Sequence, residues 1–326
     1  MEYRGEHREN LIGLLRRTGY ERMPLDFTMC PAIRKKLDDY CAATGFVVPP
    51  MGYTNLPDSA LETVRQPAFW LQFYDRSFRE GTTFCQYGVA REPGSAACNH
   101  LTYMYHPLDG MTTLEELQAY PFPKYLPDPT PEQLAAVERI HAAGQFAMGN
   151  MPCTVWETAW YARGMENIMM DMVAEPELAE FVLDTVTENA VIRAVNYAKA
   201  GADGLYLGDD IGMQSTPMMS LELYRTYLKP RLKKVIDAAR AVNPDIIVIY
   251  HSCGFATPYI PDLIEAGIDV LNPVQPESVD FDAIYKEYGD RLSFSGLLGT
   301  QSLMPFGTPE EVRATVNRYL DQIGPK

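Results

Sequence analysis

The chain has 326 residues, and 28 Lys and Arg against 43 Asp and Glu give it a formal charge of −15 and a pI near 4.8. This charge argues against binding to nucleic acid or to an anionic membrane surface, since phosphates are bound by clustered Lys and Arg. No apolar stretch is long enough to span a bilayer, the N-terminus lacks the apolar core of a signal peptide, and six dispersed cysteines do not form a disulfide scaffold, so we expect a cytoplasmic protein with free thiols.

The first part of the chain, to about residue 145, is irregular and rich in Pro, Tyr and Phe. Within it, residues 24–29 and 83–89 are candidate strands. Capping boxes at residues 113–116 and 130–133 predict the starts of two helices, the second running to about residue 143. We expect this region to be an N-terminal part, with insertions, of a single domain that covers residues 1–326.

The second half alternates between short apolar runs and helical stretches, a pattern typical of β/α units with parallel strands. Pro230 should kink one of the helices. The expected strands are residues 152–156, 204–208, 246–250, 270–273 and 292–298, and the expected helices are residues 175–200, 220–242 and 308–323.

Seven β units are found in this way, which predicts a TIM-type (β/α)8 barrel that lacks, or ends before, its eighth strand. A doubly wound open sheet is the alternative. No glycine-rich phosphate fingerprint follows any of the strands, which weakens the dinucleotide-binding version of that alternative.

Polar side chains follow four of the expected strands, at the end where barrel enzymes place their catalytic groups. We therefore expect these residues to converge on one site. They are Glu157 after the first of the four strands, Asp209, Asp210 and Gln214 after the second, His251 and Cys253 after the third, and Asn272 and Gln275 after the fourth.

His251 and Cys253 are the candidate metal ligands. Residues i and i+2 of an extended segment point to the same side, and imidazole nitrogen and thiolate sulfur are preferred ligands of Zn²⁺. Two ligands do not complete a zinc site, so at least one more is needed. The alternative interpretation is a packed cysteine beside a hydrogen-bonded histidine.

The remaining candidates have two interpretations each. Asp209 and Asp210 could form an acid/base pair or bind a metal, but Asp is also common in turns and at helix starts. Glu157 could be a third ligand or a base, or a first-turn glutamate favoured by the helix dipole. Tyr206 and Trp156 could line a substrate pocket or belong to the core.

Two segments carry a family resemblance. Gly201-Ala-Asp-Gly-Leu-Tyr-Leu-Gly-Asp-Asp-Ile-Gly-Met-Gln214 resembles a segment of the uroporphyrinogen decarboxylase-like superfamily. Tyr250-His-Ser-Cys-Gly254, together with residues 263–276, is similar to its methyltransferase branch, and residues 306–312 resemble the start of a late helix of the family. The resemblance covers roughly residues 100–326.

This resemblance implies a TIM barrel and a zinc enzyme that moves a methyl group between a small methylated substrate, such as a methyl ether, methylamine or thiol, and a corrinoid (cobalamin) carried by a partner protein. It makes His251 and Cys253 zinc ligands, Asp209, Asp210 and Glu157 catalytic candidates, and Tyr206, Gln214, Asn272, Gln275 and Trp156 substrate-binding candidates. We keep a homodimer open as the assembly. The alternatives are a decarboxylase of tetrapyrrole acetates and a non-catalytic barrel that binds a corrinoid or an aromatic ligand.

The chain departs from both branches. It lacks the Arg-rich segment that decarboxylases carry after their first strand, where Met23-Pro-Leu-Asp-Phe-Thr-Met-Cys30 stands instead. It also lacks the late cysteine that supplies the third zinc ligand in the zinc branch, because no Cys follows Cys253. We expect either that Asp209, Asp210 or Glu157 replaces this ligand, or that the complete protein continues beyond Lys326 with the eighth strand and the missing ligand.

Overall fold

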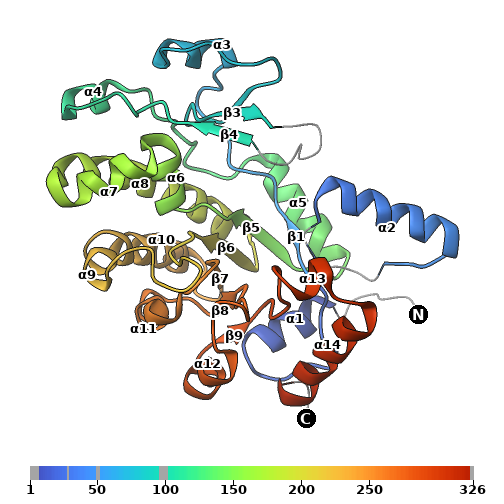
Figure 1. The fold of residues 1–326 in the computed structure, drawn as a ribbon. Coiled ribbons are helices and arrows are strands. Elements are labelled where there is room, and N and C mark those ends of the chain that lie inside the picture. The colour runs from blue at the N-terminus through green and yellow to red at the C-terminus, as the bar shows by residue number, and fades with distance from the viewer. Residues whose placement is uncertain (1–6, 28, 49–51, 95–101, 324–326) are drawn as a thin grey trace.

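The computed structural model describes residues 7–27, 29–48, 52–94 and 102–323. Its centre is a six-stranded parallel sheet with the strand order β1-β5-β6-β7-β8-β9 (Figure 1). From β5 onward, each strand pairs with the next strand in the chain. The strands are β1 Thr54–Asn55, β5 Ala147–Met151, β6 Gly204–Gly208, β7 Ile247–His251, β8 Val270–Asn272 and β9 Ser293–Phe294.

Helices follow the strands of this sheet and flank it (Figure 1). Among the connections from β5 onward, those after β5 and β6 are the longest. The helices are α6 Trp156–Arg163, α7 Met165–Ala174, α8 Pro176–Ala200, α9 Leu221–Leu223, α10 Lys229–Val242, η4 Thr257–Tyr259, α11 Ile260–Ala266, α12 Phe281–Tyr288, α13 Leu303–Phe306 and α14 Pro309–Ile323.

The N-terminal part adds helices and a separate small sheet. This second sheet is antiparallel, with the order β2-β3-β4, and lies above α6 in Figure 1. The elements are α1 His7–Leu15, α2 Pro31–Thr44, α3 Pro67–Trp70, η1 Leu71–Phe73, β2 Thr83–Phe84, β3 Ala90–Pro93, β4 Thr102–Tyr105, α4 Leu114–Ala119 and α5 Pro131–Ala142. None of the described helices is long and apolar enough to cross a membrane.

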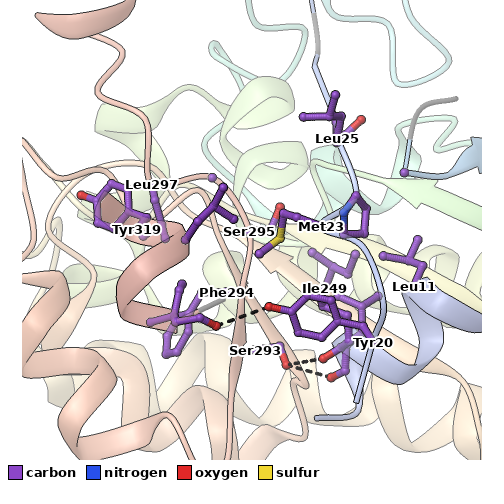
Figure 2. A pocket seen from close by; sticks show the side chains of 18 of the residues that line it. Leu11, Tyr20, Met23, Leu25, Ile249, Ser293, Phe294, Ser295, Leu297 and Tyr319 are labelled. Atoms are coloured by element: carbon purple, nitrogen blue, oxygen red, sulfur yellow. Dashed lines mark hydrogen bonds between the residues drawn. The ribbon is translucent and has the colours of Figure 1, made fainter. Parts of the chain in front are cut away.

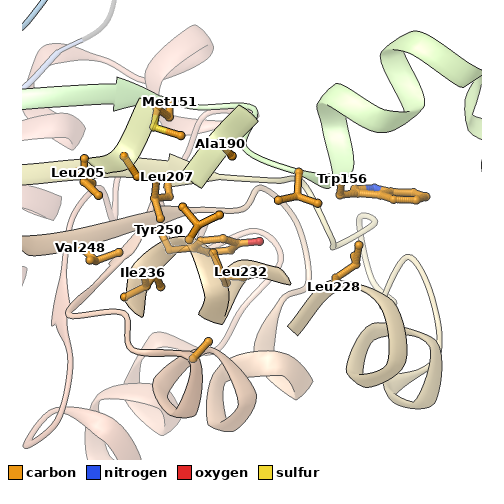
Figure 3. Close-up of a cluster of buried hydrophobic side chains, with 14 of the residues drawn as sticks. Met151, Trp156, Ala190, Leu205, Leu207, Leu228, Leu232, Ile236, Val248 and Tyr250 are labelled. Atoms are coloured by element: carbon orange, nitrogen blue, oxygen red, sulfur yellow. The ribbon is translucent and has the colours of Figure 1, made fainter. Parts of the chain in front are cut away.

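Side chains alternate between the two faces of the parallel sheet, and both faces carry buried apolar residues. On the outer face, Leu205, Leu207, Val248 and Tyr250 pack with residues of α8 and α10 (Figure 3). The inner face forms a second cluster, in which residues of β5, β7 and β8 meet α1. Its buried members are Leu11, Leu15, Phe146, Met148, Ile247, Ile249 and Val270.

The contact between β5 and α8 depends on a glycine. A Cβ atom on Gly149 would lie 2.5 Å from the ring of Tyr197, closer than real Cβ atoms come to their neighbours. The missing side chain therefore lets the Tyr197 ring lie directly against the strand backbone.

A cavity of about 660 Å³ separates β9 from residues 20–27 (Figure 2). Its lining is largely apolar and includes Leu11, Ile249, Phe294 and Leu297. No ladder between β9 and β1 closes the sheet among the described residues. The α/β architecture with a parallel sheet that the sequence predicts is confirmed, with six parallel strands in the described part of the chain.

Three of the expected strands differ from the structure. Residues 152–156 are not a strand, because β5 ends at Met151 and α6 begins at Trp156. Residues 83–89 contribute only β2, which belongs to the antiparallel sheet. Residues 24–27 have one isolated bridge residue, Leu25, and Thr28 lies outside the described residues. The two-residue strand β1 carries no sequence pattern and was not predicted.

The expected helix starts are confirmed. Reciprocal side-chain and backbone hydrogen bonds form the capping boxes of α4 and α5, and Thr308 and Glu311 form the same pair at α14. Around Pro230, the helix changes its hydrogen-bond pattern instead of ending. Residues Tyr224–Leu228 form a π-helical turn that leads into α10, which accommodates the missing N–H of the proline.

Candidate metal centre

Three potential metal ligands meet where β6 and β7 end. His251 is the last residue of β7 and pairs with Gly208, the last residue of β6. Cys253 follows His251 by two residues, and Asp210 follows Gly208 by two. The ligand atoms of Asp210, His251 and Cys253 all lie within 4.8 Å of one another.

The distances within this triad centre on the imidazole. His251 Nε2 lies 3.4 Å from Cys253 Sγ and 3.5 Å from Asp210 Oδ1. The side chains of His251 and Asp210 are 26% and 37% exposed, so a small molecule can reach them from solvent. The triad therefore offers nitrogen, sulfur and oxygen donors at an accessible position.

Asn272 on the neighbouring strand β8 orients the imidazole. His251 Nδ1 lies 2.7 Å from Asn272 Oδ1, and the Tyr206 hydroxyl donates to the same oxygen at 2.8 Å. The Asn272 amide in turn donates to Ser295 beyond β9. An Nδ1–H that donates to Asn272 leaves the Nε2 lone pair directed at the triad, which is the arrangement that metal-binding histidines use.

The loop that carries Cys253 is fixed by hydrogen bonds from its backbone. The Cys253 N–H donates to Asp210 Oδ1 at 2.7 Å, and the Gly254 N–H donates to Gln275 Oε1 at 2.8 Å. Gln275 is held by its own bond to Thr300. Gly254 has a φ of 76° and lies so close to Met213 that a Cβ atom would not fit. Gln275 therefore positions the loop.

Burial and the nearby carboxylates of Asp210 and Glu157 raise the pKa of Cys253 to about 12. Without a cation, this thiol keeps its proton at neutral pH. A divalent metal placed among the three ligands supplies the positive charge that favours the thiolate. The donor set therefore fits a zinc ion both in its chemistry and in its charge.

Asp209 lies at the expected end of the sheet, and its N–H donates to the His251 carbonyl at 3.0 Å. Its buried side chain, however, turns toward the start of α6, where it accepts hydrogen bonds from the N–H groups of Val155 and Glu157. Burial and the Glu157 carboxylate raise its pKa to about 8. In this position Asp209 holds α6 against β6.

Glu157 links α6 to the triad. Its carboxylate accepts a hydrogen bond from the Tyr161 hydroxyl at 2.7 Å and one from the Asp210 N–H at 3.3 Å. Burial raises its pKa. Glu157 thus lies beside Asp210 but is not a member of the group whose ligand atoms lie within 4.8 Å.

The structure describes the surroundings of three further candidates. Trp156 is completely buried, and its indole N–H points at the Met218 sulfur, so it packs in the core, one of the two positions that the sequence leaves open. Gln214 bonds to Ser278 and Gln301 in an exposed loop. Tyr206 contacts the back of the His251 ring through its hydroxyl.

Sequence reasoning missed two contributors near the site. Tyr161 lies one helical turn after Glu157, a spacing that could have indicated the pair once α6 was recognised. Ser295 supports Asn272 from the edge of the sheet. No sequence pattern around Ser295 indicates that it supports Asn272.

A family model described as uroporphyrinogen decarboxylase (URO-D) matches residues 106–326. This match confirms the resemblance found in the sequence and covers the chain from the residue after β4 through α14. It includes all three residues of the triad.

Two curated relatives match about half of the chain. The uroporphyrinogen decarboxylase of Chlorobium limicola is 28% identical over 153 residues, which are 47% of this chain and 41% of the relative. The methylated-thiol–coenzyme M methyltransferase of Methanosarcina mazei is 30% identical over 162 residues, which are 47% of this chain and 39% of the relative. The matched part thus spans about two fifths of the length of these relatives.

A solved structure of a methyltransferase from Methanosarcina mazei resembles the whole fold. It aligns with a TM-score of 0.63 and covers 97% of this chain and 89% of that chain, at 16% sequence identity. At this identity the likeness shows a shared architecture.

Proposed function

The chain belongs to the uroporphyrinogen decarboxylase family, and from this premise we propose that it is a zinc-dependent methyltransferase whose metal is bound by Asp210, His251 and Cys253. One observation carries the proposal. A carboxylate oxygen, an imidazole nitrogen and a thiol sulfur lie within 4.8 Å of one another at the accessible end of the parallel sheet. The orientation of His251 by Asn272 supports it further.

Zinc is the metal that this ligand set favours. Imidazole nitrogen, thiolate sulfur and carboxylate oxygen are its usual ligands, and three protein ligands leave the fourth position for a substrate. In this proposal Asp210 is the third ligand, in place of the late cysteine that the resemblance implies. Asp209 and Glu157 are then positioning groups, which hold α6 and Asp210 beside the metal.

We further propose that the substrate is a small methylated thiol and that the methyl acceptor is the cobalt of a corrinoid on a partner protein. The methylated-thiol relative and the family resemblance support this choice. Bound zinc supplies a Lewis acid, which stabilises the thiolate that remains when a thioether loses its methyl group. The chain's own part is to hold His251, Cys253 and Asp210 around the reacting sulfur and to keep the imidazole in the correct tautomer.

The test begins with the metal content of the purified protein. We expect about one zinc per chain in the wild type, as a catalytic zinc site requires. We expect little zinc in His251→Ala, Cys253→Ser and Asp210→Asn. Cys85→Ser is the matched control, because Cys85 is also a half-buried free thiol but lies outside the triad. A wild type without zinc, or a Cys253→Ser variant that keeps it, would contradict the metal site.

The second step is a methyl-transfer assay with cobalt(I) cobalamin as the acceptor, followed through the cobalt absorption spectrum. Dimethyl sulfide, a methyl ether and a methylamine are compared as donors, and we expect the thioether to react fastest. Reaction of the ether or the amine instead would correct the substrate class. Decarboxylation of a tetrapyrrole acetate without methyl transfer would support the decarboxylase, and neither activity would support a binding protein.

A further inference from the structure

Two buried residues near the metal centre have a left-handed backbone conformation. Val274 has a φ of 50° and Leu297 a φ of 70°, and both side chains belong to the hydrophobic core. They follow the ends of the neighbouring strands β8 and β9 by two and three residues. Glycine adopts this conformation freely, but for a β-branched or bulky residue it is rare and unfavourable. The fold therefore holds both residues against their local preference.

The loops that carry these two residues interlock at one carbonyl group. The Leu297 N–H donates to the Pro273 carbonyl oxygen at 3.0 Å. Gly296, with a φ of 118°, lies so close to the same carbonyl that a Cβ atom would not fit. Pro273 directly precedes Val274, so the loop after β9 holds the loop after β8 next to its left-handed turn. We call Val274 and Leu297 the left-handed pair.

The turn at Val274 lies between two side chains that support the metal centre. Asn272 Oδ1 lies 2.7 Å from His251 Nδ1, and Gln275 accepts a hydrogen bond from the Gly254 N–H at 2.8 Å. In a continuing strand, residues 272 and 275 would point to opposite faces of the sheet. Here both side chains reach the same short segment, from His251 to Gly254. The change of backbone direction around Val274 therefore sets the spacing of the two supports.

A valine restricts this turn more than a smaller residue would. A strained backbone persists only where the surrounding structure over-determines it, and such residues gather at ligand sites. A buried β-branched side chain has few rotamers and packs tightly against its neighbours. Glycine would adopt the left-handed conformation without strain, but it would also give the segment many other conformations. The buried side chain of Val274 therefore keeps the turn in one conformation.

We propose that the left-handed pair positions the metal ligands by fixing Asn272 and Gln275 relative to each other. Val274 and Leu297 are not members of the triad, so they are positioning residues that act through these two side chains. The inference rests on the proposed function, because the ligands are those of the proposed zinc site. It adds that the affinity for the metal depends on two apolar residues whose own side chains cannot bind zinc.

The alternative role of the left-handed pair is core packing alone. In that case, removal of buried methyl groups lowers the free energy of unfolding and leaves the zinc affinity unchanged. A positioning role predicts, in addition, weaker zinc binding and a less ordered segment from His251 to Gly254. The measurement that separates the two roles is therefore made at the metal centre.

The experiment compares Val274→Ala with Val89→Ala. Val89 is the matched control, because it is also a buried valine in a loop, between β2 and β3, and does not have a positive φ. We expect both variants to unfold at a lower urea concentration than the wild type. Zinc affinity, measured by competition with a chromogenic chelator, should fall about tenfold in Val274→Ala, as after loss of an outer partner of a metal ligand. It should stay unchanged in Val89→Ala.

Two further variants complete the series. Val274→Thr keeps the β-branched shape but buries a hydroxyl group, so it should lose stability and keep a zinc affinity close to that of the wild type. Leu297→Ala removes the other member of the pair and should weaken zinc binding. It takes the place of Val274→Ala if that variant does not fold. Unchanged zinc affinity in Val274→Ala, or an equal loss in Val89→Ala or Val274→Thr, would overturn the proposal.

Amide hydrogen exchange in the metal-free protein tests the proposal without zinc. The N–H groups of Gly254 and Leu297 are hydrogen-bonded, and they should exchange faster in Val274→Ala than in the wild type or in Val89→Ala. If the wild type binds no zinc but the exchange differs as expected, the left-handed pair still positions the segment and the proposed function alone fails. If zinc binds and Val274→Ala changes neither affinity nor exchange, the inference fails and the proposed metal enzyme stands.

Discussion

Asn272 is a single side chain on which the geometry of the metal centre depends. It accepts from both His251 and Tyr206 and is itself held by Ser295. Without this acceptor, the imidazole can rotate or take the other tautomer, and the Nε2 lone pair is no longer directed at Cys253 and Asp210. The role is that of the carboxylate or carbonyl partner found behind most metal-binding histidines.

We expect Asn272→Leu to weaken zinc binding by about 10–100-fold, the usual effect of removing such a partner. Affinity is measured by competition with a chromogenic chelator. Asn272→Asp keeps an oxygen acceptor at the same position, so its affinity for zinc should fall much less. Equal affinities of the wild type and the leucine variant would show that His251 is oriented by other contacts.

The residues of the triad could be predicted from the sequence only in part. His251 and Cys253 share an i, i+2 spacing at the end of an apolar run, so the sequence alone indicates them. Asp210 could not be separated from Asp209, because adjacent residues in a loop can turn either way.

At the scale of elements, apolar and β-branched composition decides which strands are predictable. The run Ile246-Ile-Val-Ile-Tyr250 predicts β7 to within one residue. β5 has the sequence Ala-Met-Gly-Asn-Met, which contains no β-branched residue. The sequence therefore predicts the strand at residues 152–156, the next apolar run, instead. As a result Trp156 was placed at the end of a strand, whereas it is the first residue of α6 and is buried in the core.

The packing of α8 on β5 gives a stability prediction. Gly149→Ala places a methyl group into the Tyr197 ring, and overpacking of this kind costs about 1–3 kcal/mol. We expect a correspondingly lower free energy of unfolding in urea. Gly110→Ala is the control, because nothing lies within 4 Å of the added carbon and its φ is not positive. Equal stabilities of the two variants would mean that Tyr197 moves aside without cost.

At the scale of the whole molecule, the metal centre joins β6 and β7 and, through Asn272, β8. A metal bound only by the folded chain raises the unfolding free energy by about 2.7 kcal/mol at a concentration one hundred times its Kd. We expect zinc to raise the melting temperature by a few degrees for a chain of this length. A chelator should reverse the shift, and Cys253→Ser should show none.

If the melting temperature of the wild type does not respond to zinc or to the chelator, the triad does not bind the metal in the folded state. A response of equal size in Cys253→Ser would place the zinc elsewhere on the protein. The measurement thus tests the site independently of catalysis.

The order of the strands has a consequence for how the chain acquires its structure during synthesis. Because β5, β6, β7, β8 and β9 are neighbours in the order in which they leave the ribosome, the sheet can grow by one strand at a time. Asp210 emerges first, then His251 and Cys253, and last Asn272. A nascent chain can therefore build half of the sheet before it has a complete set of metal ligands, and the imidazole receives its partner from β8 only after all three ligands have emerged.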